Sequence, residues 1–265
     1  MNLIDTHAHL DGADFAVDLD AVLARAAAAG VATMVSCGQD EATSRVTLAL
    51  AGAHPQIEPA VGVHPHEARN AGDLRWLDAM LDDPAVVAAG EMGLDNHYDF
   101  SPRDVQREVL GSQLDRAQAH SLPVILHCRE AEDDLAAILR ERFTRGSLGV
   151  VHCFTGPYEW GARLVEEFGL FLGIGGAVTF KNAKELHDAV ARLPLEQLVL
   201  ETDCPFMTPA PHRGKRNEPA YLALTCARLA ELRGTTPEAI AAATTANAHR
   251  LFPRIARRSG SEIRA

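Results

Sequence analysis

Residues 3–9 read Leu3-Ile4-Asp5-Thr6-His7-Ala8-His9, an apolar start that ends in two histidines spaced one residue apart. Successive side chains of a β-strand point to opposite faces, so His7 and His9 point the same way. In a barrel of parallel strands, side chains at the carboxyl ends converge on one mouth, where such enzymes place their chemistry. If the same arrangement recurs along the chain, this stretch predicts a (β/α)8 TIM barrel with its site at that mouth.

The arrangement recurs after four further short apolar runs. These place Glu91 after 85–90, His127 after 123–126, His152 after 149–151 and Asp203 after 198–202. Each residue alone is explained as simply by a core, cap or loop position. Four imidazoles and two carboxylates are too many ligands for one tetrahedral ion but suit two divalent ions. Their recurrence at strand ends therefore predicts a two-metal hydrolase.

Strand-like and helix-like segments alternate over the whole length. The expected strands are 2–7, 31–37, 57–63, 85–91, 123–128, 148–153, 169–174 and 197–203, and the clearest helices are 18–29, 103–120, 131–142, 158–168, 181–192, 219–233 and 236–251. The strand-like runs are nearly all apolar, as expected for strands buried on both faces. Such alternation favours the α/β class with one barrel. We expect one domain over residues 1–253 and a frayed, flexible tail over 254–265.

The composition is that of an ordinary globular protein. The chain has 265 residues, of which 47% are hydrophobic and 23% charged, near the length typical of this barrel. No stretch approaches the length of a membrane span, and the first residues lack the basic region of a cleaved signal. We therefore expect a cytoplasmic protein with no membrane partner, and a monomer.

The five cysteines form no C-x-x-C pair and are odd in number, which argues against a disulfide framework. Cys128, Cys153 and Cys204 each directly follow a proposed ligand. The next residue of a strand faces away, so we expect these three to be small buried side chains packed against helices.

The net charge of −11 excludes a general nucleic-acid-binding surface. A polyanionic substrate would therefore have to be recognised locally. The chain has only three lysines (Lys181, Lys184 and Lys215), and none ends a strand, where a carbamylated lysine could join two metals. A carboxylate must take that place, and Glu91 is the obvious one.

Several longer motifs resemble one known family. They are 5–10 (DTHAHL), 61–66 (VGVHPH), 90–95 (GEMGLD), 125–129 (ILHCR), 151–156 (VHCFTG), 201–205 (ETDCP) and 211–219 (PHRGKRNEP). Together they resemble the TatD-like metal-dependent hydrolases, and the resemblance runs from Asp5 to about Phe252. No ligand position is missing. Position 8 is Ala where relatives often have Cys or Ser, on the face turned away from the metals.

The resemblance implies a TIM barrel, two divalent ions and a DNase, often a 3′-to-5′ exonuclease. It implies that His7, His9 and Asp203 hold one ion, that His127 and His152 hold the other, and that Glu91 bridges them. Asp203 and Glu91 would be the catalytic carboxylates, with Asp203 suited to take the proton of the attacking water. Four histidine ligands favour Zn, Mn, Fe or Ni over Mg, and leave the identity of the ion open.

Four other residues are candidates for binding substrate. His64 ends the third strand and could donate to a phosphate oxygen or cap its loop. Arg129 could clamp phosphate with its planar fork or pair with Glu130 or Glu132. Arg213 and Arg216 lie in the basic cluster 212–216 and could contact a neighbouring phosphate of DNA, or pair with Glu218 or neighbouring carboxylates to hold the loop.

Residues near the ligands have supporting roles in this hypothesis. Asp5 and Glu201 are expected to orient ligand imidazoles from below. His97 and Tyr98 could stack on a base or simply pack their loop. Two other functions stay open: an acyl or ester hydrolase, such as an aminoacyl-tRNA deacylase, and a metal-binding partner protein without catalysis.

Overall fold

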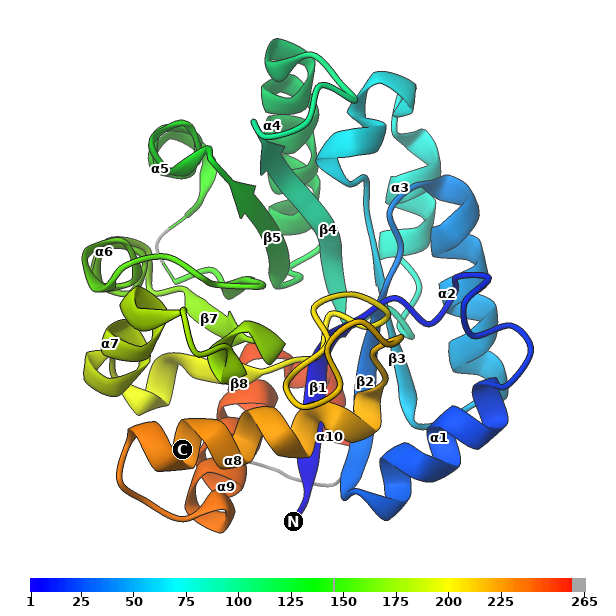
Figure 1. Cartoon of the computed structure of the whole chain (residues 1–265). Coiled ribbons are helices and arrows are strands. Elements are labelled where there is room, and N and C mark those ends of the chain that lie inside the picture. Colours follow the sequence, from blue (N-terminus) through cyan, green and yellow to red (C-terminus); the bar gives the residue numbers. More distant parts are fainter. Residues whose placement is uncertain (145, 259–265) are drawn as a thin grey trace.

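Eight parallel strands form a single sheet in the order β1 to β8, and a helical segment follows each strand (Figure 1). The computed structural model describes residues 1–144 and 146–258. The strands are β1 (Leu3–Ala8), β2 (Val31–Cys37), β3 (Ile57–Val61), β4 (Ala88–Asp95), β5 (Val124–Arg129), β6 (Gly149–Val151), β7 (Phe171–Ile174) and β8 (Leu198–Leu200). The sheet curls into a nearly closed barrel, as the sequence predicts.

Hydrogen bonds across the last seam bring β1 against the end of β8. The Asp203 amide donates to the carbonyl of His7 at 2.9 Å, and the His9 amide donates to the carbonyl of Cys204 at 2.8 Å. The Thr6 hydroxyl donates to the carbonyl of Leu200 at 3.0 Å. The seam therefore lies directly beneath His7, His9 and Asp203, and barrel closure itself brings these residues together.

Eight α-helices surround the sheet and two more follow them. They are α1 (Leu19–Ala28), α2 (Glu41–Ala53), α3 (Arg75–Leu81), α4 (Arg103–Ala119), α5 (Glu132–Arg142), α6 (Tyr158–Phe168), α7 (Lys184–Arg192), α8 (Leu222–Leu232), α9 (Pro237–Leu251) and α10 (Pro253–Arg258). All seven helices named from the sequence are present with small shifts of their ends. Helices α2 and α3 were not among the clearest sequence signals. Of the residues described, no helix combines the length and the apolar character needed to cross a membrane.

Four strands, β3, β6, β7 and β8, are shorter than predicted, and two of them bear on the site. Strand β6 ends at Val151 and β8 ends at Leu200, so His152 and Asp203 stand just past the last paired residue. Asp203 and Cys153 have positive φ angles of 55° and 48°, a left-handed conformation that does not continue a strand. The side-chain alternation expected from a strand therefore stops before these residues.

The expectation of a frayed tail is wrong for residues 254–258, which belong to α10; residues 259–265 lie outside the described part. Phe252 and Ile255 are buried, at 0% and 2% exposure, and pack with the residues that fill the barrel interior, such as Val35 and Ile125. Arg254 donates to the carbonyls of Asp83 and Val86, just before β4. The spacing of Phe252, Ile255 and Ala256 fits an amphipathic turn. This turn closes the barrel at the amino ends of the strands.

Replacing Ile255 with alanine should lower the free energy of unfolding by about 2–5 kcal/mol, because a fully buried aliphatic side chain would leave a cavity. The measurement is the denaturation midpoint in urea. Arg257→Ala, on the exposed side of the same helix, is the matched control and should change little. Equal midpoints for the two variants would show that α10 does not seal the core.

Candidate metal centre

All six residues predicted to bind metal converge at the carboxyl ends of the strands, around Glu91. Glu91 comes from β4 and is 1% exposed. Its two carboxylate oxygens face different sets of ligand atoms. The nitrogens or oxygens of His7, His9 and Asp203 gather on the side of Oε2, and those of His127 and His152 gather on the side of Oε1.

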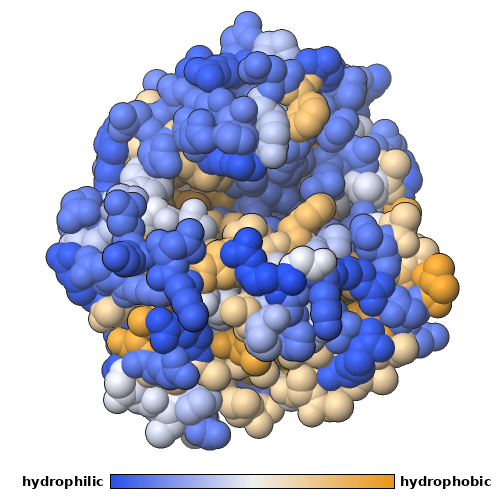
Figure 2. Space-filling model, in the orientation of Figure 1, coloured by the Kyte–Doolittle hydropathy of each residue, from blue (hydrophilic) through white to orange (hydrophobic). Residues whose placement is uncertain are grey.

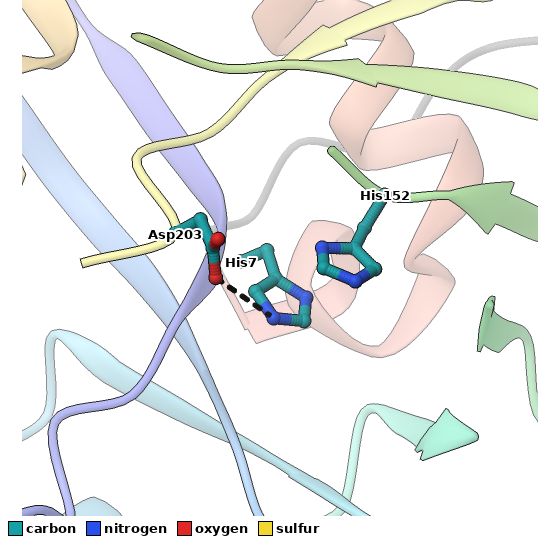
Figure 3. Close-up of side chains that lie close together, drawn as sticks. All are labelled: His7, His152 and Asp203. Carbon is teal, nitrogen blue, oxygen red and sulfur yellow. Dashed lines mark ion pairs between the residues drawn. The ribbon is translucent and has the colours of Figure 1, made fainter. Parts of the chain in front are cut away.

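The first set is compact. His7 Nε2 and His9 Nε2 lie 3.4 and 3.5 Å from Glu91 Oε2, and 3.7 and 3.5 Å from Asp203 Oδ1. The two Nε2 atoms are 3.1 Å apart. Figure 3 shows the Asp203 carboxylate directed at a nitrogen on the edge of the His7 ring, and the His152 ring stacks on a face of the His7 ring at 3.9 Å between centroids. Four donor atoms at such separations can surround one small cation.

The second set shares the other oxygen of Glu91. His152 Nε2 lies 2.7 Å and His127 Nδ1 lies 3.0 Å from Glu91 Oε1, and these two nitrogens are 3.1 Å apart. Triads within ligand distance are His7 with His152 and Asp203, His7 with His9 and Glu91, and His64 with Glu91 and His127. The two oxygens of Glu91 therefore face two neighbouring groups of candidate ligand atoms.

Hydrogen bonds outside the centre fix the directions of the imidazoles. His9 Nδ1 lies 3.0 Å from the carbonyl of Cys37, which can only accept, so His9 carries a proton there and turns the Nε2 lone pair inward. His127 Nε2 lies 3.1 Å from Asp95 Oδ2, which likewise leaves the Nδ1 lone pair facing inward. His7 Nδ1 lies 3.5 Å from Cys37 Sγ. Ligand histidines in metal sites are held in this way.

Protein groups alone leave polar atoms of this centre without hydrogen-bond partners. Glu91 Oε2 is buried without a hydrogen-bond partner among the described residues, a costly state for a carboxylate oxygen. Two inward imidazole nitrogens in each set stand 3.1 Å apart. In each pair the ring held from outside, His9 or His127, turns the lone pair of its neutral form toward the other nitrogen. A divalent cation in each set would satisfy the nitrogens and the carboxylate, so the residues fit the metals.

The protonation of the centre follows from its crowding. Burial lowers the pKa of His9, but the hydrogen bond with Asp203 and the charge of Glu91 outweigh it and raise the pKa to about 9. Burial likewise lowers the pKa of His152, yet Glu91 and Glu201 hold it well above its usual range. For Glu91, burial raises the pKa, but the charges of His152, His64 and His7 keep it well below its usual range. Without metals, His9 and His152 therefore compensate the carboxylates as cations at neutral pH.

Metal binding should therefore release protons. A coordinating imidazole must be neutral, so at pH 7 the binding of ions should displace at least the protons of His9 and His152. Apparent affinity should weaken as the pH falls, because protons compete more strongly, and the contribution of His9 should vanish above about pH 9. The measurement is calorimetric titration of metal-free protein with Zn²⁺ in buffers of different ionisation enthalpy. Heats independent of the buffer at pH 7 would contradict this scheme.

His64 stands beside the second set as a donor. Its Nδ1 accepts a hydrogen bond from the His66 amide at 3.1 Å, and burial lowers its pKa to about 4. The neutral ring therefore carries its proton on Nε2, which lies 3.4 Å from Glu91 Oε1. Although its position is within ligand distance, this tautomer suits donation to an oxygen rather than binding of a metal.

The arginines predicted to bind substrate are placed differently from one another. The Arg129 guanidinium lies 4.9 Å from the centre of the Tyr98 ring at the mouth, and Glu130 pairs with His97 instead. Arg216 is engaged by Asp18 in two hydrogen bonds of 2.8 Å, a pairing with a neighbouring carboxylate that holds the loop, and its role as a phosphate contact stays a prediction. Arg213 lies 3.9 Å over the Phe180 ring, outside the metal cleft.

Of the two residues expected to orient imidazoles, Asp5 needs correction and Glu201 does not. Asp5 does not orient an imidazole: its carboxylate accepts from the Thr202 amide at 2.9 Å and from the Thr202 hydroxyl at 2.5 Å, and so holds the strand end that leads to Asp203. Glu201 does reach a ligand, with Oε1 3.7 Å from His152 Nδ1. It also accepts from the Cys153 amide at 2.5 Å.

The prediction that the cysteines after ligands face away holds only for Cys204, which is buried. Cys128 and Cys153 line the cleft. Cys153 does so because its left-handed conformation breaks the strand alternation, and Cys128 stands near the end of β5, where the chain leaves the barrel.

Sequence reasoning missed Asp95 and Cys37. Asp95 is fully buried at the end of β4, and its Oδ2 lies 2.9 Å from His66 Nε2 and 3.1 Å from His127 Nε2. Asp95 lies four residues after Glu91 on the same strand, so both side chains lie on the same face. This spacing could have identified Asp95 as a residue of the site. Cys37 acts through its backbone carbonyl, which residue type does not reveal.

A cleft of about 590 Å³ opens above the centre. Its lining includes His9, His64, Glu91, His127, His152, Asp203, Tyr98, Arg129 and Phe206. The candidate ligands therefore form the floor, and aromatic and cationic side chains form the rim.

Comparisons with known proteins agree with this arrangement. A family model described as TatD related DNase matches residues 4–253. The chain is 43% identical over 252 residues to an uncharacterized metal-dependent hydrolase, YabD, of Bacillus subtilis, covering 94% of this chain and 98% of the relative. It is 38% identical to the 3′-5′ ssDNA/RNA exonuclease TatD of Erwinia tasmaniensis, covering 94% and 99% of the two chains. The crystal structure of YjjV, a TatD homologue from Escherichia coli, superposes with a TM-score of 0.89 at 37% identity, covering 95% and 98%.

Proposed function

Because this chain belongs to the TatD-related DNase family of metal-dependent hydrolases, we propose that it is a two-metal phosphodiesterase that cleaves DNA, with single strands and 3′ ends as its substrates. One observation carries the proposal: the two oxygens of Glu91 face two separate sets of ligand atoms. Adjacent divalent ions suit a reaction in which both the attacking and the leaving oxygen need stabilisation. Relatives whose names include 3′-5′ ssDNA/RNA exonuclease support the substrate class.

We propose that His7, His9 and Asp203 hold one ion, that His127 and His152 hold the other, and that Glu91 joins them. Divalent ions bound there would supply Lewis acidity to the phosphodiester and lower the pKa of water at the site. Zn, Mn, Ni, Fe and Mg are all candidates, and the histidine-rich set favours the first four.

The remaining steps belong to side chains of the chain itself. Burial raises the pKa of Asp203, but the hydrogen bond with His9 and the charges of His7 and His152 hold it below its usual range. Asp203 is therefore ionised at neutral pH and can orient the attacking water and accept its proton. His64 Nε2 can donate to a phosphoryl oxygen above Glu91. Arg129, at the rim, can contact a non-bridging oxygen of the neighbouring phosphate.

The test is hydrolysis of end-labelled single-stranded DNA by the full chain with Mn²⁺ or Zn²⁺, with EDTA as the control. We expect shortening from the 3′ end, loss of activity in EDTA and recovery when metal is restored. An aminoacyl-tRNA or a simple aryl ester is incubated in parallel. Cleavage of the acyl ester with intact DNA would replace this proposal by an acyl hydrolase, and metal binding without either reaction would indicate a non-catalytic protein.

A further inference from the structure

Three aromatic side chains are strongly exposed in the described part of the chain, and all three stand at the mouth of the metal cleft. Tyr98, Phe100 and Phe206 are 41%, 53% and 56% exposed. Tyr98 and Phe206 line the cleft itself, and the Phe100 ring lies 5.2 Å from the Tyr98 ring. Figure 2 shows separate apolar patches on this otherwise largely hydrophilic face. Exposed rings gathered at one site indicate a binding surface rather than scattered surface residues.

The first wall consists of Tyr98 and Phe100, in the loop after β4. His66 supports both rings, at 5.5 Å from Tyr98 edge to face and at 4.7 Å from Phe100. The Arg129 guanidinium lies 4.9 Å from the Tyr98 ring centre, which places a cation next to the aromatic surface. Within the described residues, no carboxylate forms an ion pair with Arg129. This wall therefore offers a π face and an unused charge side by side.

Asp95 fixes the first wall relative to the metal ligands. Its Oδ1 accepts from the amides of His97 and Tyr98 at 2.9 and 3.1 Å, while its Oδ2 faces His66 and His127. One buried carboxylate thus holds the loop that bears Tyr98, the ring that supports it and a candidate ligand of the second ion. These hydrogen bonds fix the position of the Tyr98 ring relative to the candidate metal ligands.

The second wall is Phe206, on the side of the other ligand set. Its ring centroid lies 6.0 Å from that of His9. Phe206 and Met207 border both the metal cleft and a neighbouring pocket of about 560 Å³ that is lined by Arg213 and Lys215. A DNA strand that passes from the cleft over Phe206 would therefore enter a pocket with cationic side chains.

We propose that the two aromatic walls bind the nucleobases on either side of the scissile phosphodiester, Tyr98 and Phe100 one base and Phe206 the other. This inference rests on the proposed cleavage of DNA and adds that the shortest good substrate is an unpaired dinucleotide step. A base stacks on a protein ring only through a free π face, which a duplex covers with neighbouring bases. Arg129 beside the first wall, and Arg213 and Lys215 beyond the second, match the phosphates that flank such a step.

Binding is measured separately from turnover. Full-length metal-loaded protein is titrated with a short single-stranded oligonucleotide that has phosphorothioate linkages and 2-aminopurine next to its 3′ end. Stacking on the walls should quench the 2-aminopurine fluorescence. Tyr98→Leu with Phe100→Leu, and separately Phe206→Leu, should each weaken binding by about tenfold, within the range measured for one stacked base. Tyr98→Phe keeps the ring and should bind like the wild type.

Val46→Ala, an exposed apolar residue on α2, is the matched control and should change nothing. Metal content and thermal melting should match the wild type in all wall variants and so report an intact centre. Unchanged affinity and quenching in both leucine variants would overturn the inference even if DNA is cleaved. If the protein cleaves no DNA but the leucine variants lose the quenching, the stacking of bases on the walls is supported and the proposed nuclease function is contradicted. Equal affinity for duplex and single-stranded DNA would also contradict the binding of unpaired bases by the walls.

Discussion

Replacing Glu91 with alanine should remove most of the bound metal and lower the turnover of DNA by about 10³-fold or more. Both oxygens of this carboxylate face ligand sets, so its loss affects two ions at once. Metal ions contribute several kcal/mol to the stabilisation of a transition state, and each 1.4 kcal/mol corresponds to a factor of ten in rate. The measurements are metal content after reconstitution and dialysis, and the rate of cleavage of end-labelled DNA.

Two single-set variants are the controls for Glu91. His7→Ala and His127→Ala each remove a donor from one set, so each should retain more metal than Glu91→Ala. Thermal melting of the metal-free proteins checks that all three are folded. If Glu91→Ala binds as much metal as either histidine variant, the carboxylate does not join two ions.

Replacing Asp203 with asparagine should lower kcat by about 10²–10⁴-fold, the usual contribution of a general acid or base. Asparagine keeps the shape of the side chain and one oxygen towards His7 and His9, but it cannot accept a proton. The fold should persist, because barrel closure at this point uses the backbone amide of Asp203 rather than its carboxylate. Turnover and metal content are measured on the same preparation.

The loss of turnover in Asp203→Asn, compared with its loss of bound metal, identifies the role of the carboxylate. A large fall in kcat with nearly full metal content would support proton acceptance. A fall that excess metal restores would show that the residue acts only as a ligand. Near-normal turnover would place proton acceptance on another group, with Glu91 or bulk water next.

The barrel could be predicted because its signals are local. Apolar runs, helical periodicity and glycines at helix ends each report on a few neighbouring residues, and their alternation leaves few possible folds. The ligand positions could be predicted because the carboxyl ends of parallel strands, which can be located in the sequence, lie together at the mouth of the barrel. The convergence of His7 and Asp203, 196 positions apart in the printed sequence, needed only the assumption of closure.

The errors arose where distant partners decide the outcome. Arg216 had two predicted roles, contact with a phosphate and pairing with a nearby carboxylate, but no local pattern announces that Asp18, at the beginning of α1, is its partner. Cys153 was expected to face away, but its left-handed backbone turns it into the cleft. Residues 254–258 were expected to be part of a frayed tail, but the buried side chains of Ile255 and Ala256 decide where the segment packs.

The closing turn at the base of the barrel also sets an order of events during synthesis. The ribosome delivers His7 long before Asp203, and Phe252 and Ile255 later still. Until that last turn emerges, the interior is open to water at its base and β1 lacks its final support. A nascent chain therefore has histidines without a finished coordination shell. We expect the ions to be acquired after translation, from whatever pool of metal the released protein meets.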